Sequence, residues 1–305
     1  MHWAPQPPSA SRAFYKAVRA GCFQLEALIP HDILHPKLKR GGGMNKIPVM
    51  DTAGRVWNFA TNELPTIFRL TWCPLSLVLL IQLISTYFIF RAVGVGQQGS
   101  LGAVIMPIVM MFFVMVATTV AVVALHRLIL FGDDKPGHYV YLSFGKTEFL
   151  FVALPVAIYF VMFIVIVVTA LISQWLTGLV GLAAVFVIFR VFLIFPIIVV
   201  EGRYDFEQAW DLGRGNVLRF VGLFLIVFLP ILVVMVIIGV IVGALIPNTF
   251  DPRTFQPAFG PRIVFDLAFQ FVASIVSTAL GVGVLSYSYK AAKGLAPDAT
   301  LRPGT

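Results

Sequence analysis

Arg190 is the residue whose position most needs a chemical explanation. It lies within an apolar stretch well before Glu201, which on a helix places it roughly 16 Å from the helix end at about 1.5 Å per residue. A charge at this depth costs roughly 2.5–3.5 kcal/mol on insertion scales, so such a side chain normally faces protein or water. We predict a buried structural role for Arg190. The predicted acceptors at comparable depth are Gln82, Thr118 and Thr119.

Two alternatives for Arg190 remain open from the sequence. The guanidinium could bind an anionic ligand, or the long side chain could extend toward the headgroups. Asp266 is a less suitable partner, because it lies near the other end of its apolar stretch.

No catalytic or metal-binding motif accompanies Arg190. The sequence lacks Gly-x-Ser-x-Gly, His-Glu-x-x-His, a phosphate-binding glycine loop and Cys-x-x-Cys. His31 and His35 have helical spacing but no third ligand nearby. Asp133, Asp134 and His138 lie in a turn rich in Gly and Pro, where ordinary loop charges are the simpler interpretation. We predict a protein that is not an enzyme and has no catalytic, cofactor-binding or metal-binding residues.

The elements that position these residues are predicted to be membrane-spanning helices. Of the 305 residues, 59% are hydrophobic and only 12% are charged, whereas a soluble domain carries about 25% charged residues. Several charge-free runs exceed the ~20 residues that cross a bilayer. The expected fold is an all-α membrane protein with six transmembrane helices, at about 73–92, 104–131, 149–172, 177–200, 218–246 and 263–289.

The distribution of Lys and Arg predicts the orientation of these helices. Basic residues collect in the N-terminal region, in the second and fourth loops and in the tail; the exceptions are Arg91, Arg253 and Arg262. Positive residues favour the cytoplasmic side, so both termini are expected in the cytoplasm of a bacterium, with the chain in its inner membrane. The net charge of +8 then indicates contact with anionic headgroups on that side, not with nucleic acid.

Composition divides the chain into three parts. Residues 1–43 contain prolines, a Gly41–Gly43 run and scattered basic residues, which predicts a disordered extension; Met44 is an alternative translation start. Residues 44–293 form the six-helix domain, and 294–305 a short cytoplasmic tail. Cys22 and Cys73 both fall on or near the reducing side, so no disulfide is expected.

Short amphipathic stripes precede three of the predicted spans. They are Ala53, Val56, Trp57 and Ala60; Phe206, Ala209, Trp210 and Gly213; and, more weakly, His138, Tyr141, Leu142 and Gly145. Their i, i+3, i+4, i+7 spacing is one face of a helix. We predict three repeats, each an interfacial amphipathic helix followed by a transmembrane hairpin. Trp57, Tyr141 and Trp210 would be anchors at headgroup level; chance similarity among short matches is the alternative.

Small residues within the spans predict close helix packing. Ala273, Ser277 and Gly281 form an i, i+4, i+8 stripe, and Gly239 and Gly243 form a Gly-x-x-x-Gly. Such residues let helix backbones approach closely in a membrane. The contacts could lie within one chain or between chains, so a homo- or hetero-oligomer is possible.

Two stretches resemble a known family. They are Arg190-Val-Phe-Leu-Ile-Phe-Pro-Ile-Ile-Val-Val-Glu-Gly202, continuing to Ala209–Asn216 and Arg219, and the ending Leu285-Ser-Tyr-Ser-Tyr-Lys290. They are similar to a largely uncharacterised family of six-helix bacterial membrane proteins, whose membrane domain is also fused to some glycerophosphodiester phosphodiesterases. The resemblance covers roughly 52–293 and implies the six-helix fold. It implies no hydrolase activity, because the catalytic barrel is absent.

The expected function is an accessory, membrane-organising or lipid-contacting role. A carrier or channel for a hydrophobic or anionic small molecule is the alternative, because Pro107, Pro155, Pro196 and Pro230 could bend or break spans. The predicted spans contain few polar residues, fewer than a solute pathway is expected to need. A lipid-modifying enzyme is the third possibility.

Overall fold

The computed structural model describes residues 45–94, 101–132, 142–245, 250–251, 256–257, 261–296 and 298–301. The chain divides into two units, Met1–Gly43 and Met44–Thr305, and all described residues belong to the second. The predicted disordered extension, the alternative start at Met44, the anchor Tyr141 and the 133–138 loop lie outside the described residues.

Six helices are long and apolar enough to span a membrane. They are α4 (Leu64–Gly94), α5 (Leu101–Phe131), α6 (Lys146–Ile172), α7 (Gln174–Val191) continued by α8 (Ile194–Glu201), α10 (Val217–Leu245) and α11 (Pro261–Ala292). The chain is therefore an all-α, multi-pass membrane protein, and the predicted six spanning helices are confirmed. A two-residue pairing of β1 (Phe250–Asp251) with β2 (Gln256–Pro257) lies between α10 and α11.

The fourth span was predicted as one continuous helix at 177–200, but in the structure it is broken into two helices. α7 ends at Val191 and α8 begins at Ile194. Pro196 explains the position of the break: it has no N–H for the carbonyl of Phe192, and its ring disfavours a helical turn there. The first span also differs from the prediction, because α4 begins at Leu64 and continues through the internal Pro74.

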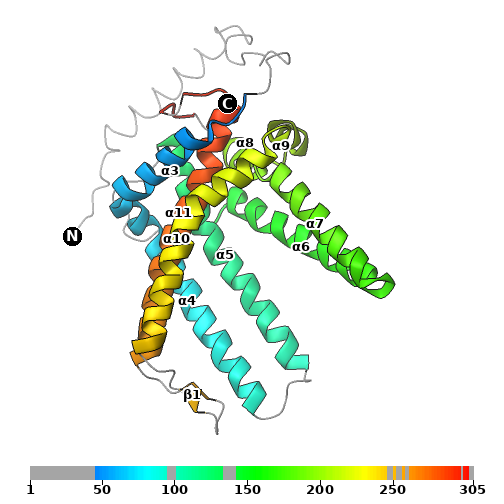
Figure 1. The fold of residues 1–305 in the computed structure, drawn as a ribbon, viewed down its shortest axis with the longest axis vertical. Coiled ribbons are helices and arrows are strands. Elements are labelled where there is room, and N and C mark those ends of the chain that lie inside the picture. The colour runs from blue at the N-terminus through cyan, green and yellow to red at the C-terminus, as the bar shows by residue number, and fades with distance from the viewer. Residues whose placement is uncertain are drawn as a thin grey trace, which may run out of the picture. The chain divides into compact units, whose positions relative to one another are not determined.

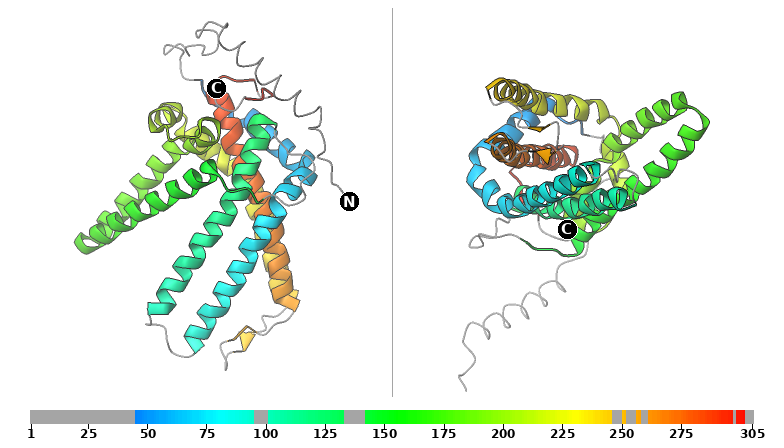
Figure 2. Two further views of the ribbon diagram at one scale, coloured as in Figure 1. Left: turned by 180° about the vertical axis from the view of Figure 1, so that it is seen from behind. Right: turned by 90° about the horizontal axis from the view of Figure 1, so that it is seen from below.

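The spanning helices form two groups (Figures 1 and 2). α4 and α5 pack side by side, and α11 packs on both of them with α10 beside it. The α6–α7 hairpin leans away from α4 and α5 in every view. One apolar core joins α4, α5 and α11; its buried members include Ile67, Leu75, Ala121, Leu125 and Ala279.

Two of the three predicted short helices are present. α3 (Val49–Asn62) precedes α4 and crosses α11 and α10, and α9 (Phe206–Gly213) precedes α10 and packs on α7 and α8 (Figure 1). The third is not found in the described part of its segment, because residues 142–145 lead into α6 without helical structure. The three-fold repeat stays a prediction.

The predicted environment of the stripes was wrong in one respect. Ala53, Val56 and Ala60 of α3 are buried in the protein core, not laid against headgroups. Val56 lies so close to Gly283 of α11 that a Cβ on Gly283 would be 3.1 Å from a Val56 methyl. Ala209 and Gly213 of α9 are buried too.

Both ends of the described chain meet at one end of the bundle, which we call the α3–α9 end (Val49–Asn62, Phe206–Gly213 and the close of α11 at Lys290–Ala292). The amide of Ile47 donates to Asn216 Oδ1 at 3.1 Å. Lys290 Nζ donates to the Ile129 carbonyl at 2.8 Å, and the Leu301 amide to the Leu130 carbonyl at 2.8 Å. These donors satisfy carbonyls that the end of α5 would otherwise leave unpaired, and an even number of spans explains why they meet there.

Candidate functional site

An apolar cavity of about 400 Å³ lies where α5, α6, α10 and α11 meet the α7–α8 break. This volume falls within the ~300–1,000 Å³ of typical small-molecule sites. Its lining contains no charged residue and consists of Met115, Thr118, Thr119, Val122, Phe151, Pro155, Phe192, Phe195, Phe224, Thr278, Gly281, Val282 and Leu285. A cavity with such walls favours hydrocarbon over water.

Packed aromatic rings form one wall of the cavity. Phe151 and Phe195 have ring centroids 4.9 Å apart, Phe195 and Phe192 5.6 Å apart, and Phe192 and Phe224 5.8 Å apart. These separations are typical of favourable aromatic pairs. The break after α7 positions this wall, because it places Phe192 in the turn and Phe195 in the first turn of α8.

A glycine on α11 leaves part of the cavity unfilled, because it has no side chain. Gly281 of α11 faces it, and a Cβ there would meet only the Phe228 ring, at 3.8 Å. Gly281 was predicted as part of a packing stripe with Ala273 and Ser277. The structure places it at a cavity instead, while Ser277 is exposed.

The polar groups of the cavity are three threonine hydroxyls. Thr118 donates its proton to the carbonyl of Val114 in its own helix, at 2.8 Å. Within the described part of the chain, the hydroxyls of Thr119 and Thr278 make no hydrogen bond. The cavity can therefore accommodate an apolar molecule and offer it hydrogen bonds, but it holds no acid or base.

A buried pair, His126 and Ser286, lies beside this wall. His126 Nδ1 and Ser286 Oγ are 2.8 Å apart, and both residues are fully buried. The His126 ring packs against Phe151 with centroids 5.7 Å apart, and its Nε2 has no hydrogen-bond partner. The partner of His126, Ser286, is on α11 and lies too far along the chain for sequence spacing to reveal the pair.

Arg190 lies outside the cavity and stacks on Trp210. Its guanidinium carbon is 3.6 Å from the centre of the Trp210 ring, a cation–π contact between α7 and α9. Its Nε is buried without a hydrogen-bond partner. Gly213 allows this approach: a Cβ there would overlap the Arg190 carbonyl oxygen and lie 2.9 Å from the carbonyl carbon.

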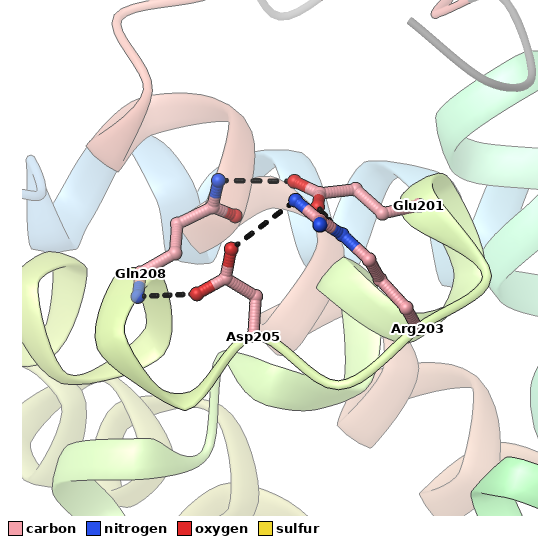
Figure 3. Close-up of polar contacts among 4 residues, drawn as sticks. All are labelled: Glu201, Arg203, Asp205 and Gln208. Atoms are coloured by element: carbon pink, nitrogen blue, oxygen red, sulfur yellow. Dashed lines mark hydrogen bonds and ion pairs between the residues drawn. The ribbon is translucent and has the colours of Figure 1, made fainter.

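A polar network joins the end of α8 to the start of α9, the helix that carries Trp210 (Figure 3). Asp205 caps α9 by accepting from the Gln208 amide at 2.9 Å, and the Gln208 side chain donates to Glu201 at 3.0 Å. Arg203 bridges Glu201 at 3.1 Å and Asp205 at 3.5 Å. These contacts tie the last residue of α8 to the first turn of α9.

Tyr204 joins the same turn to α6. Its hydroxyl donates to the carbonyl of Leu150 at 2.8 Å. Burial raises the pKa of this phenol, which keeps the proton on the donor. The α8–α9 turn is thereby held against α6, the helix that contributes Phe151 to the aromatic wall.

The predicted polar cluster around Arg190 was wrong. Gln82 of α4 instead accepts from the Gln270 side chain of α11 at 2.6 Å, in a separate hollow of about 190 Å³ that Asp266 also lines. Thr118 and Thr119 line the cavity on α5. Position along a span does not specify which side of a helix faces which neighbour.

The site has to be interpreted from this geometry alone. Comparisons with protein families, curated proteins and solved structures find no match for this chain. The resemblance to the six-helix family stays a prediction.

The remaining predicted residues are distributed over the surface of the bundle. Trp57 is half-buried against the core, whereas Trp210 is 40% exposed. Gly239 and Gly243 face open space: in the part of the chain that the structure describes, nothing lies within 4 Å of where their Cβ atoms would stand. They therefore pack against no other helix in the described part of the chain.

Sequence reasoning missed the buried Glu148. Its carboxylate accepts from the Gly145 amide at 2.9 Å, which caps α6, and lies 3.2 Å from Arg127 Nη2 at the end of α5. A signal existed, because Glu148 stands three residues after Gly145, which ends the third stripe just before a span. Among the described residues, no three His, Cys, Asp or Glu side chains come together as a metal site would need.

Proposed function

We propose that the chain is a non-enzymatic, lipid-contacting protein of a bacterial inner membrane, and that its cavity holds one long apolar molecule. The cavity between α5, α6, α10 and α11 is the observation that carries this proposal. It has a volume of about 400 Å³, is open to its surroundings and is lined by apolar side chains. An apolar surface of this kind is better solvated by hydrocarbon than by water, so a hydrocarbon occupant is favoured.

The surroundings of the cavity support an occupant drawn from the bilayer. The α6–α7 hairpin exposes large apolar side chains along its length, including Phe160, Phe163, Leu171 and Trp175. In a bilayer such a surface is solvated by acyl chains. An apolar molecule can therefore reach the cavity without crossing water.

The proposed orientation places the α3–α9 end in the cytoplasm. This end carries the described basic residues Arg127, Arg203, Arg214 and Arg219, and positive residues favour that side. Trp210 and the basic side chains would then contact anionic headgroups.

A carrier for a hydrophobic molecule is the second candidate. Broken spans are common in carriers, where they line the substrate site. The break between α7 and α8 contributes Phe192 and Phe195 to the cavity wall, which favours this candidate over a channel for an anion. Arg190 is not in that wall.

Filling the cavity tests the proposal. Gly281→Leu would extend a side chain into the cavity, and Gly239→Leu on α10 is the matched control because its Cβ position is open and remote from the lining. After purification in mild detergent, native mass spectrometry should find a bound apolar molecule on wild-type protein and on Gly239→Leu. We expect Gly281→Leu to retain about tenfold less, the factor that ~1.4 kcal/mol of binding represents.

Equal occupancy in Gly281→Leu and Gly239→Leu would contradict the proposal. Met115→Phe is a second filling variant at another lining position, for use if Gly281→Leu does not fold. Its expected result is the same.

A further inference from the structure

Thr119 and Thr278 line the cavity, and their hydroxyls make no hydrogen bond to a described residue. Hydroxyls in apolar helices commonly donate to a carbonyl one turn earlier. Thr71, Thr118 and Thr169 do so here, at 2.8 Å each, to Ile67, Val114 and Val165. Thr119 and Thr278 make no such bond in the described part of the chain, although each lies within a helix with carbonyls available.

Both threonines line the same cavity. Thr119 is on α5 and Thr278 on α11, and the other lining residues are apolar apart from Thr118, whose proton is already donated. An unpaired hydroxyl in a water-poor apolar site costs free energy comparable to a lost hydrogen bond. Two hydroxyls from two helices thus border one cavity, each with a proton that no described residue accepts.

We infer that the occupant of the cavity carries a hydrogen-bond acceptor, a carbonyl oxygen on an otherwise apolar molecule, and that Thr119 and Thr278 donate to it. This inference rests on the proposed function and adds the chemical class of the ligand. A carboxylate is excluded as the acceptor, because the lining supplies no cation to compensate a buried charge. An ester of a membrane lipid and the ring carbonyl of an alkylated quinone both have the required chemistry.

The aromatic wall agrees with such a ligand. Phe192, Phe195 and Phe224 offer apolar surface on the side opposite α11, and the hydroxyls lie on α5 and α11. A ligand with an apolar body and one acceptor can satisfy both sides at once. A pure hydrocarbon would leave the two donors unpaired.

A pair of probes separates this inference from the proposed function. Methyl palmitate carries an ester carbonyl, and heptadecane is an alkane of similar length. Each is added to purified protein in mild detergent, and its apparent affinity is taken from the rise in melting temperature with probe concentration. Wild-type protein should bind methyl palmitate about fivefold more tightly than heptadecane, as one net hydrogen bond would give.

The variants test which hydroxyls are responsible. Thr119→Val and Thr278→Val should each reduce the preference for methyl palmitate. Thr118→Val is the matched control, because it removes a neighbouring hydroxyl whose proton Val114 already accepts, and it should keep the preference. Thr119→Ser and Thr278→Ser keep a hydroxyl and should keep the preference too, which separates a lost hydrogen bond from a packing defect.

The failures are distinguishable. If neither probe stabilises wild-type protein more than Gly281→Leu, the proposed function is wrong. If both probes stabilise wild-type protein equally, only the inference that the ligand carries an acceptor is wrong. If Thr118→Val loses the preference for methyl palmitate, the roles given to Thr119 and Thr278 are wrong.

Two further probes identify the source of the carbonyl. A diacyl phospholipid that stabilises the protein more than its diether analogue assigns the site to a lipid ester, whereas stabilisation by an alkylated benzoquinone assigns it to a quinone. Stabilisation by neither would contradict the inference.

Discussion

Arg190 shows how the partner of a residue can differ from the one that its sequence environment predicts. A buried structural role was predicted for Arg190, and the structure has it partly buried and stacked on Trp210, 3.6 Å from the ring centre. The partner is an aromatic face and not the predicted amide and hydroxyls. α9 folds back along α7 after the α8–α9 turn, and that fold places the indole within reach.

The cation–π contact can be measured by a double-mutant cycle. Arg190→Ala and Trp210→Ala should each lower the melting temperature in detergent, and their effects should be coupled by about 0.5–2 kcal/mol. Trp175 is the control aromatic, because it is 88% exposed at the far end of the α6–α7 hairpin. Arg190→Ala combined with Trp175→Ala should be additive; equal coupling to both tryptophans would show that Arg190 has no specific partner.

At the scale of elements, two glycines determine how closely the short helices approach the spans. Gly213 of α9 lies against the backbone of Arg190 in α7, and Gly283 of α11 lies against Val56 in α3. Neither glycine has a positive φ, so the requirement at both is space and not backbone conformation. The Gly-x-x-x-Gly of α10 was also predicted to bring helices close together, but its glycines contact no other helix among the described residues.

Gly213→Ala tests the α7–α9 approach. Its Cβ would overlap the Arg190 carbonyl, so α9 must shift, and overpacking of this kind costs about 1–3 kcal/mol. Gly222→Ala in α10 is the control, because nothing described lies within 4 Å of its Cβ position and alanine favours a helix. We expect a lower melting temperature for Gly213→Ala only; equal melting of the two variants would mean that α9 does not pack closely on α7.

At the scale of the whole molecule, six spans and a shared α3–α9 end require both ends of the described chain to lie on one side of the membrane. Contacts between Asn216 and Ile47, and between Leu301 and Leu130, close this end. The side itself is a prediction from the distribution of basic residues.

Topology reporters test the orientation. Tags at the C-terminus and in the 132–137 loop should report the cytoplasm, and tags near Gln97 or Arg253 should report the periplasm. The expected pattern alternates, because an odd number of spans separates each tagged site from the next: α5, then α6, α7–α8 and α10, and then α11. A periplasmic report from the C-terminal tag, with the Gln97 tag in the cytoplasm, would reverse the orientation and leave the fold unchanged.

The sequence by itself determined the number and type of the spans, because that information is local. A run of about 20 apolar residues can satisfy its backbone hydrogen bonds in lipid only as a helix or in a closed barrel. The stripe of α3 was predictable for the same reason, since Ala53, Val56 and Ala60 recur with helical spacing.

The tertiary structure alone decided which faces meet. The cavity combines Thr119, Phe151, Phe224 and Thr278 from four helices, and the burial of α3 depends on Gly283 in the last of them. Hydropathy is nearly uniform around these helices, so it does not indicate which face turns toward a neighbour and which toward lipid. Packing between residues far apart in the chain determines these contacts. It also determines the partner of Arg190 and the place of the two unpaired hydroxyls.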